Sequence, residues 1–97
     1  MLTLPIKKKW FDMILSGEKK EEYRDIKPYY CSRFKERFNQ EFQYIKFRNG
    51  YSKESRTIQC KVSIKKGVGR VEWGASIGTL YYVITIVDIL TLEGVCR

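Results

Sequence analysis

The chain has 97 residues, of which 43% are hydrophobic and 14% aromatic, which is enough apolar material for a small core and too much for a disordered polyelectrolyte. We therefore expect a single domain over residues 1–97. The 19 lysine and arginine residues exceed the 11 acidic ones, and there is no histidine, so the formal charge is +8 at pH 7. This balance favours a polyanionic partner, and the lack of histidine removes the most frequent general base.

The first part of the chain predicts a strand, a helix and a second strand. Residues 2–6 alternate in polarity, and Pro5 indicates either an edge strand or the end of the strand. Apolar residues then recur at helical spacing over residues 10–15, and Gly17 suits a left-handed cap at the end of that helix. An extended segment is expected at residues 20–24.

A second helix is predicted over residues 28–38, with Pro28 in its first turn. Polar and apolar residues alternate over residues 43–48 and 56–66, which predicts two strands, and Asn49-Gly50 is a strong turn signal between them. The β-branched and aromatic stretch at residues 80–89 predicts a buried strand. This order indicates an α+β fold, a mixed or antiparallel β-barrel with about two flanking helices.

The three cysteines, Cys31, Cys60 and Cys96, are too far apart in sequence for a Cys-x-x-Cys site. Their spacing predicts no metal site and no cofactor, and it favours reduced thiols in a cytoplasmic protein. The longest apolar stretch is interrupted by Thr85 and Asp88 and is too short to cross a bilayer, so we expect no membrane partner.

Gly17 to Arg24 reads Gly-x-Lys-x-x-Glu-x-Arg, a concentration of charge just after the first helix. In an extended segment Glu22 and Arg24 share one face with Lys20, while Lys19, at the turn, swings to either side. A carboxylate that fixes a guanidinium leaves the remaining donors free to bind phosphate or base edges. The alternative is an exposed ion network worth about 0–1 kcal/mol.

Residues 10–24, an apolar helix that ends in Ile-Leu-Ser-Gly-Glu-Lys followed by Glu22 and Arg24, resemble the ASCH domain, a small β-barrel family similar to the PUA RNA-binding fold. Residues 47–51, 72–74 and 81–84 are similar to features of bacterial and phage members. The resemblance implies a PUA-like barrel that binds RNA, or a nucleotide derived from RNA, in a basic cleft around the motif.

In this interpretation Lys19 and Arg24 contact phosphate or base, and Glu22 orients Arg24. Single-stranded RNA is bound by stacking on aromatic rings and by contacts to phosphates. Tyr51 follows a turn among polar and basic residues, so it is the best-placed ring, while Asn49 either reads a base edge or satisfies a left-handed turn. The predicted binding residues are Lys19, Glu22, Arg24, Arg48, Asn49, Tyr51 and Lys53.

The sequence is also compatible with two enzyme hypotheses. If the protein is an enzyme, its candidate catalytic residues are Lys19, Glu22 and Arg24. A nucleoside amidohydrolase branch of the family resembles Gly-x-Lys-x-x-Thr-x-Arg, but here Glu22 stands at the threonine position. Either Lys19 acts with a lowered pKa, or Ser16 or Ser52 substitutes for the missing hydroxyl. A ribonuclease would use Lys19 and Arg24 to stabilise a pentavalent phosphate. An interaction module that docks through residues 33–37 is a third class. The oligomeric state is open too, because a barrel edge exposed near residues 81–86 would pair with a second copy.

Overall fold

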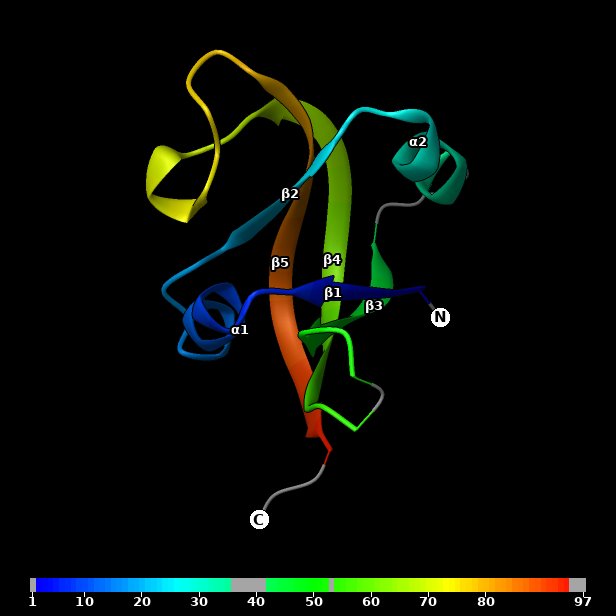
Figure 1. The fold of residues 1–97 in the computed structure, drawn as a ribbon, viewed down its shortest axis with the longest axis vertical. Coiled ribbons are helices and arrows are strands. Elements are labelled where there is room, and N and C mark those ends of the chain that lie inside the picture. The colour runs from blue at the N-terminus through cyan, green and yellow to red at the C-terminus, as the bar shows by residue number, and fades with distance from the viewer. Residues whose placement is uncertain (1, 36–41, 53, 95–97) are drawn as a thin grey trace.

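Residues 2–35, 42–52 and 54–94 are described by the structure, a computed structural model. A five-stranded mixed sheet curls into a half-barrel, and two helices flank its first strand (Figure 1). The elements in chain order are β1 (Leu2–Ile6), α1 (Lys8–Leu15), β2 (Glu21–Asp25), α2 (Pro28–Phe34), β3 (Gln43–Asn49), β4 (Thr57–Val68), the 3-10 helix η1 (Val71–Trp73) and β5 (Leu80–Glu93).

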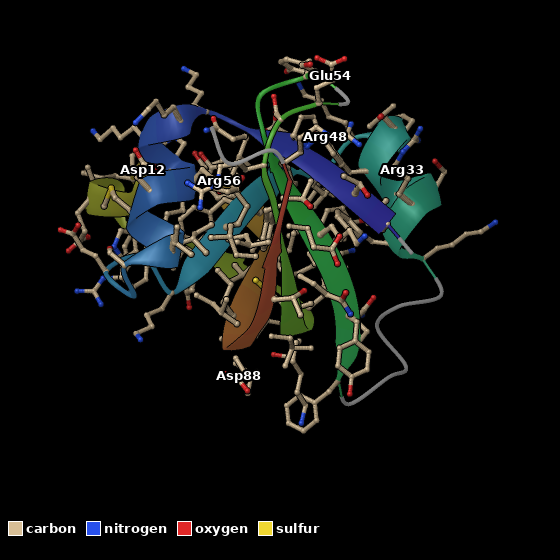
Figure 2. The ribbon with its side chains drawn as sticks, turned by 90° about the horizontal axis from the view of Figure 1, so that it is seen from below. Asp12, Arg33, Arg48, Glu54, Arg56 and Asp88 are labelled. Atoms are coloured by element: carbon tan, nitrogen blue, oxygen red, sulfur yellow. The ribbon has the colours of Figure 1, made fainter. Side chains whose placement is uncertain are left out.

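The strand order is β1-β3-β4-β5-β2, with β1 parallel to β3 and every other pair antiparallel. The inner face carries alternate residues of the strands, such as Ile58 and Val62 of β4, which are fully buried. Phe11 and Ile14 of α1 and Phe34 of α2 belong to the same buried cluster. Both helices therefore fill the concave side of the sheet, and Asp88 lies on the side away from them (Figure 2).

Several expectations from the sequence are confirmed. The fold is α+β with a curled mixed sheet and two helices, and Pro5 lies on an edge strand. The first helix ends at Leu15, and Gly17 adopts a left-handed φ of 86°. The alternation at residues 43–48 and 56–66 corresponds to β3 and β4.

Other expectations need correction. The extended segment begins at Glu21 rather than at residue 20. The second helix ends at Phe34, and Lys35 is its C-cap. Residues 36–38 of the predicted helix lie outside the described part of the chain. The edge near residues 81–86, which the sequence left as one that a second copy could use if it were open, is occupied by β2, because residues 81–85 form its antiparallel partner. The free part of β5 lies further along the strand.

The connection between β4 and β5 folds back onto β2. The Tyr23 hydroxyl accepts a hydrogen bond from the Arg70 backbone N–H at 2.9 Å, and the Tyr81 hydroxyl accepts one from the Ser76 N–H at 2.9 Å. The two tyrosine rings lie 5.6 Å apart, and Ala75 is buried beside them. These contacts fix η1 against the outer face of β2 and β5.

Gly69→Ala tests this close packing. A Cβ at position 69 would lie 2.7 Å from Ala75 Cβ and 2.7 Å from the Tyr23 ring, so we expect the free energy of unfolding to fall by about 1–3 kcal/mol. In the matched control Gly67→Ala the new Cβ meets Val83 Cγ2 at an ordinary 3.7 Å, and we expect a change within about 0.5 kcal/mol. Urea unfolding followed by circular dichroism measures both, and equal stability of the two variants would contradict this packing.

Candidate functional site

The two edge strands of the half-barrel, β1 and β2, are joined by a side chain. No backbone ladder links them in the described residues. Instead, Arg24 of β2 donates a hydrogen bond from Nη2 to the Pro5 carbonyl of β1 at 2.8 Å. Its Nη1 donates to the Tyr30 hydroxyl of α2 at 3.1 Å. The Arg24 guanidinium thus connects both edges of the sheet and the second helix.

Glu22 holds Arg24 in this position and connects it to Lys19. One carboxylate oxygen, Oε2, accepts a hydrogen bond from Arg24 Nη2 at 2.8 Å, and Oε1 lies 2.9 Å from Lys19 Nζ. The exposed fractions of the side chains are 1% for Lys19, 8% for Glu22 and 12% for Arg24. The motif therefore forms a buried cation–anion–cation cluster, not the exposed network that was the alternative.

The left-handed turn at Gly17 brings Lys19, rather than Lys20, to Glu22. Besides its ion pair, Lys19 Nζ donates to the Trp73 carbonyl at 2.7 Å and lies 4.2 Å from the centre of the Trp10 ring. Burial is the largest effect on this ammonium and lowers its pKa below 10.5, while the charge of Glu22 opposes the shift. Lys20, which was expected beside Glu22, is exposed.

A cavity of about 400 Å³ lies in the gap between β1 and β2. Its lining consists of Pro5, Ile6, Lys7, Trp10, Glu22, Arg24, Gly50 and Tyr51. Lys7 and Arg24 supply positive charge, and Trp10 and Tyr51 supply aromatic surface. Both oxygens of Glu22 are held by Lys19 and Arg24, so the positive charge of Lys7 and Arg24 is not balanced by a free carboxylate on this wall. The cavity therefore favours a ligand rich in acceptor oxygens.

The start of α1 borders this cavity and is positively charged. The first helical hydrogen bond runs from the Phe11 N–H to the Lys7 carbonyl at 2.9 Å, so the preceding N–H groups have no acceptor within the helix. No side chain caps this end, and its first turn contains no acid. Lysines at a helix N-terminus are unfavourable by about 0.3–1 kcal/mol each. An anion bound here would offset that cost.

The structure brings some of the other predicted residues to the cavity and leaves others outside it. Tyr51 lines the rim and is 87% exposed. Gly50, with φ 85°, adopts the left-handed conformation of the turn, so Asn49 does not have to adopt it. Asn49 is the last residue of β3 and does not line the cavity. Arg48 lies beside β1, opposite Pro5 (Figure 2), and Lys53 lies outside the described residues.

Sequence reasoning did not include Lys7 among the binding residues and favoured a core position for Trp10. Trp10 packs against the core and also lines the cavity. The feature of the sequence that could have indicated Lys7 as a binding residue is the run Lys7-Lys8-Lys9, which stands at the start of a helix with no acidic residue in its first turn. Lys19, in contrast, is not a lining residue of this cavity, and its predicted contact to phosphate stays a prediction.

Among the described residues, no three His, Cys, Asp or Glu side chains are grouped so that they could hold a metal ion. The helices of the described part of the chain are too short or too polar to cross a membrane. Comparison of the chain with protein-family models, curated proteins and solved structures finds no match.

Glu22→Ala tests the role of the buried carboxylate. The substitution leaves Lys19 and Arg24 buried without a counter-charge, so we expect the free energy of unfolding to fall by about 3–5 kcal/mol. Asp12→Ala is the matched control, since it removes a carboxylate that pairs with Lys8 at an exposed position, and we expect at most about 1 kcal/mol. Chemical denaturation measures both. Similar small losses would mean that the cluster does not stabilise the fold.

Proposed function

We propose that this protein binds RNA, or a nucleotide derived from RNA, in the cavity between β1 and β2. The observation that carries the proposal is the combination of groups on its walls: two cations, two aromatic side chains and a carboxylate whose oxygens are both engaged. The cavity volume falls within the range of about 300–1,000 Å³ that is usual for small-molecule sites.

The polar groups at the cavity are mainly donors. Lys7 and Arg24 are cationic lining residues, and the first N–H groups of α1 have no acceptor within the helix. The Pro5 and Ile6 carbonyls already accept hydrogen bonds, from Arg24 and from the Gly50 N–H respectively. A phosphate group supplies several charged acceptor oxygens at once. We place a phosphate between Lys7 and Arg24.

Aromatic surface at the rim supports a nucleobase next to that phosphate. Tyr51 is the most exposed tyrosine of the described chain and follows the turn at Gly50. A base that stacks on such a ring gains about 1–3 kcal/mol. The carbonyl and ring nitrogen atoms of a base are also acceptors, which matches the donors of the wall.

We extend the proposal to the family. The half-barrel and the Gly-x-Lys-x-x-Glu-x-Arg motif support a PUA-like fold of the ASCH type, and a cytoplasmic location accompanies it. Binding is preferred to hydrolysis because Glu22 occupies the position of the threonine of the amidohydrolase branch. The hydroxyls of Ser16 and Ser52 make local hydrogen bonds, and neither residue lines the cavity.

Fluorescence anisotropy with short single-stranded RNA and matched DNA tests this proposal. We expect salt-dependent binding of RNA by the parent protein. Tyr51→Ala should weaken it by about 5- to 150-fold, the equivalent of one lost stacking contact of 1–3 kcal/mol. Lys7→Ala should weaken it too and reduce the slope of log K against log salt by about one phosphate contact.

Two substitutions away from the cavity serve as controls. Tyr44→Ala removes a half-exposed tyrosine from the outer face of β3, and Lys65→Ala removes an exposed lysine from β4. Both should bind RNA nearly as the parent does. The proposal is wrong if the parent does not bind, or if the two control variants lose as much affinity as the two cavity variants.

A further inference from the structure

The exposed side of α2 carries a guanidinium stacked on a tyrosine ring. Tyr29 is 57% exposed, and the Cζ atom of Arg33, one turn later in the helix, lies 3.5 Å from the centre of its ring. Arg33 is exposed as well and donates a hydrogen bond from Nη1 to the Tyr29 carbonyl at 3.2 Å. Hydrogen bonds engage the edge of a guanidinium and leave its plane for stacking. The Tyr29–Arg33 pair is therefore a planar, cationic and exposed surface.

Arg24 connects this pair to the cavity between β1 and β2. Arg24 lines the cavity, and its Nη1 donates to the Tyr30 hydroxyl at 3.1 Å. The Arg24 Cζ atom lies 5.7 Å from the centre of the Tyr30 ring, and the Tyr30 and Tyr29 ring centres are 4.9 Å apart, so the Tyr29 ring is within about 11 Å of that carbon. Figure 1 shows α2 at the opposite end of β1 from α1. The pair thus continues the cavity on the side away from α1.

Tyr30 supplies a hydrogen-bond donor between the cavity and the pair. A tyrosine hydroxyl accepts hydrogen bonds and also donates one. The Tyr30 hydroxyl accepts from Arg24, and none of the described residues accepts its proton. The buried Phe34 holds the Tyr30 ring in place, since the two rings stack with their centres 6.0 Å apart. A fixed donor beside a guanidinium favours a charged acceptor oxygen, such as that of a phosphate.

The charges near the pair suit a polyanion. The first turn of α2 contains no acidic residue, and Lys27 stands at its N-cap. Asp25, which precedes the helix, lies 3.6 Å from the Lys27 ammonium, and the Glu22 carboxylate is held by two cations. Single-stranded nucleic acid is bound where cations follow the phosphates and planar side chains stack on successive bases. The cavity and α2 together supply both in succession.

We propose that the ligand is a strand of RNA rather than a free nucleotide, and that α2 holds the nucleotide next to the one in the cavity. This inference rests on the proposed function, because it takes the first nucleotide as bound in the cavity. The phosphate that joins the two nucleotides accepts a hydrogen bond from the Tyr30 hydroxyl. The second base stacks on the Tyr29–Arg33 pair, since bases stack on guanidinium planes as well as on aromatic rings.

Isothermal titration calorimetry with adenosine 5′-monophosphate and with the 5′-phosphorylated RNA trinucleotide of adenosine tests this inference. We expect the trinucleotide to bind about 5- to 150-fold more tightly, as one additional stacked base would give. Tyr29→Ala should remove most of this gain and leave the affinity for the mononucleotide unchanged. Arg33→Lys keeps the charge but loses the plane, so it should remove most of the gain while the salt dependence stays the same.

Phe42→Ala is the matched control. Phe42 is 43% exposed, and Lys61 Nζ lies 4.5 Å from the centre of its ring, so it too combines an exposed ring with a cation. Lys61 is the register partner of Asp88, which lies on the side of the sheet away from the helices (Figure 2). Both affinities of this variant should equal those of the parent protein. Circular dichroism establishes that each variant is folded; if Tyr29→Ala is not, Arg33→Lys, at an exposed position, carries the test.

The inference and the proposed function fail in different ways. Equal affinities of the parent protein for the two ligands would overturn the inference, leave the cavity as a site for a mononucleotide and direct the search for a partner of α2 toward proteins. A gain that survives both Tyr29→Ala and Arg33→Lys would overturn it as well. If neither ligand binds, the proposed function is wrong and the inference falls with it.

Discussion

Arg24 stands between the two edge strands of the half-barrel, and its position depends on the buried carboxylate of Glu22. Placing two cations and one anion in this interior costs several kcal/mol of hydration per ion, and the hydrogen bonds among them and to the Trp73 and Pro5 carbonyls offset that cost. Apolar side chains often stabilise such a position equally well. We infer that the cluster matters because it holds a charged guanidinium at the cavity.

The cluster also links distant parts of the chain. The Trp73 carbonyl of η1 accepts from Lys19, Lys19 pairs with Glu22, and Glu22 orients Arg24 beside the cavity. The Tyr23 and Tyr81 hydroxyls fix the loop that carries η1, so its carbonyl is held in place before any ligand arrives. Preorganised donors bind without reorganisation, which favours the anion binding that we propose.

Local patterns predicted the elements better than their assembly. Alternation and helical spacing identified β3, β4 and α1, and the two-residue period placed Glu22 and Arg24 on one face. The choice between Lys19 and Lys20 depended on the exact path of the turn after Gly17, which residue types do not define. Lys7 and Trp10 line the cavity because the start of α1 lies close to β2, and this proximity is a tertiary contact that local sequence patterns do not define. The free edge of β5 likewise follows from how short β2 is, not from the sequence of β5 itself.

The most direct test of the binding site is an NMR titration of the ¹⁵N-labelled protein with a nucleoside monophosphate, with the nucleoside alone as the comparison. The account predicts saturable shifts of the Arg24 Nε–H signal and of the backbone amides of Lys8, Lys9, Gly50 and Tyr51, stronger with the phosphate present. Amides along the β5 edge should stay unchanged. Shifts that never saturate and spread over the exposed lysines, with Arg24 Nε–H unmoved, would contradict it.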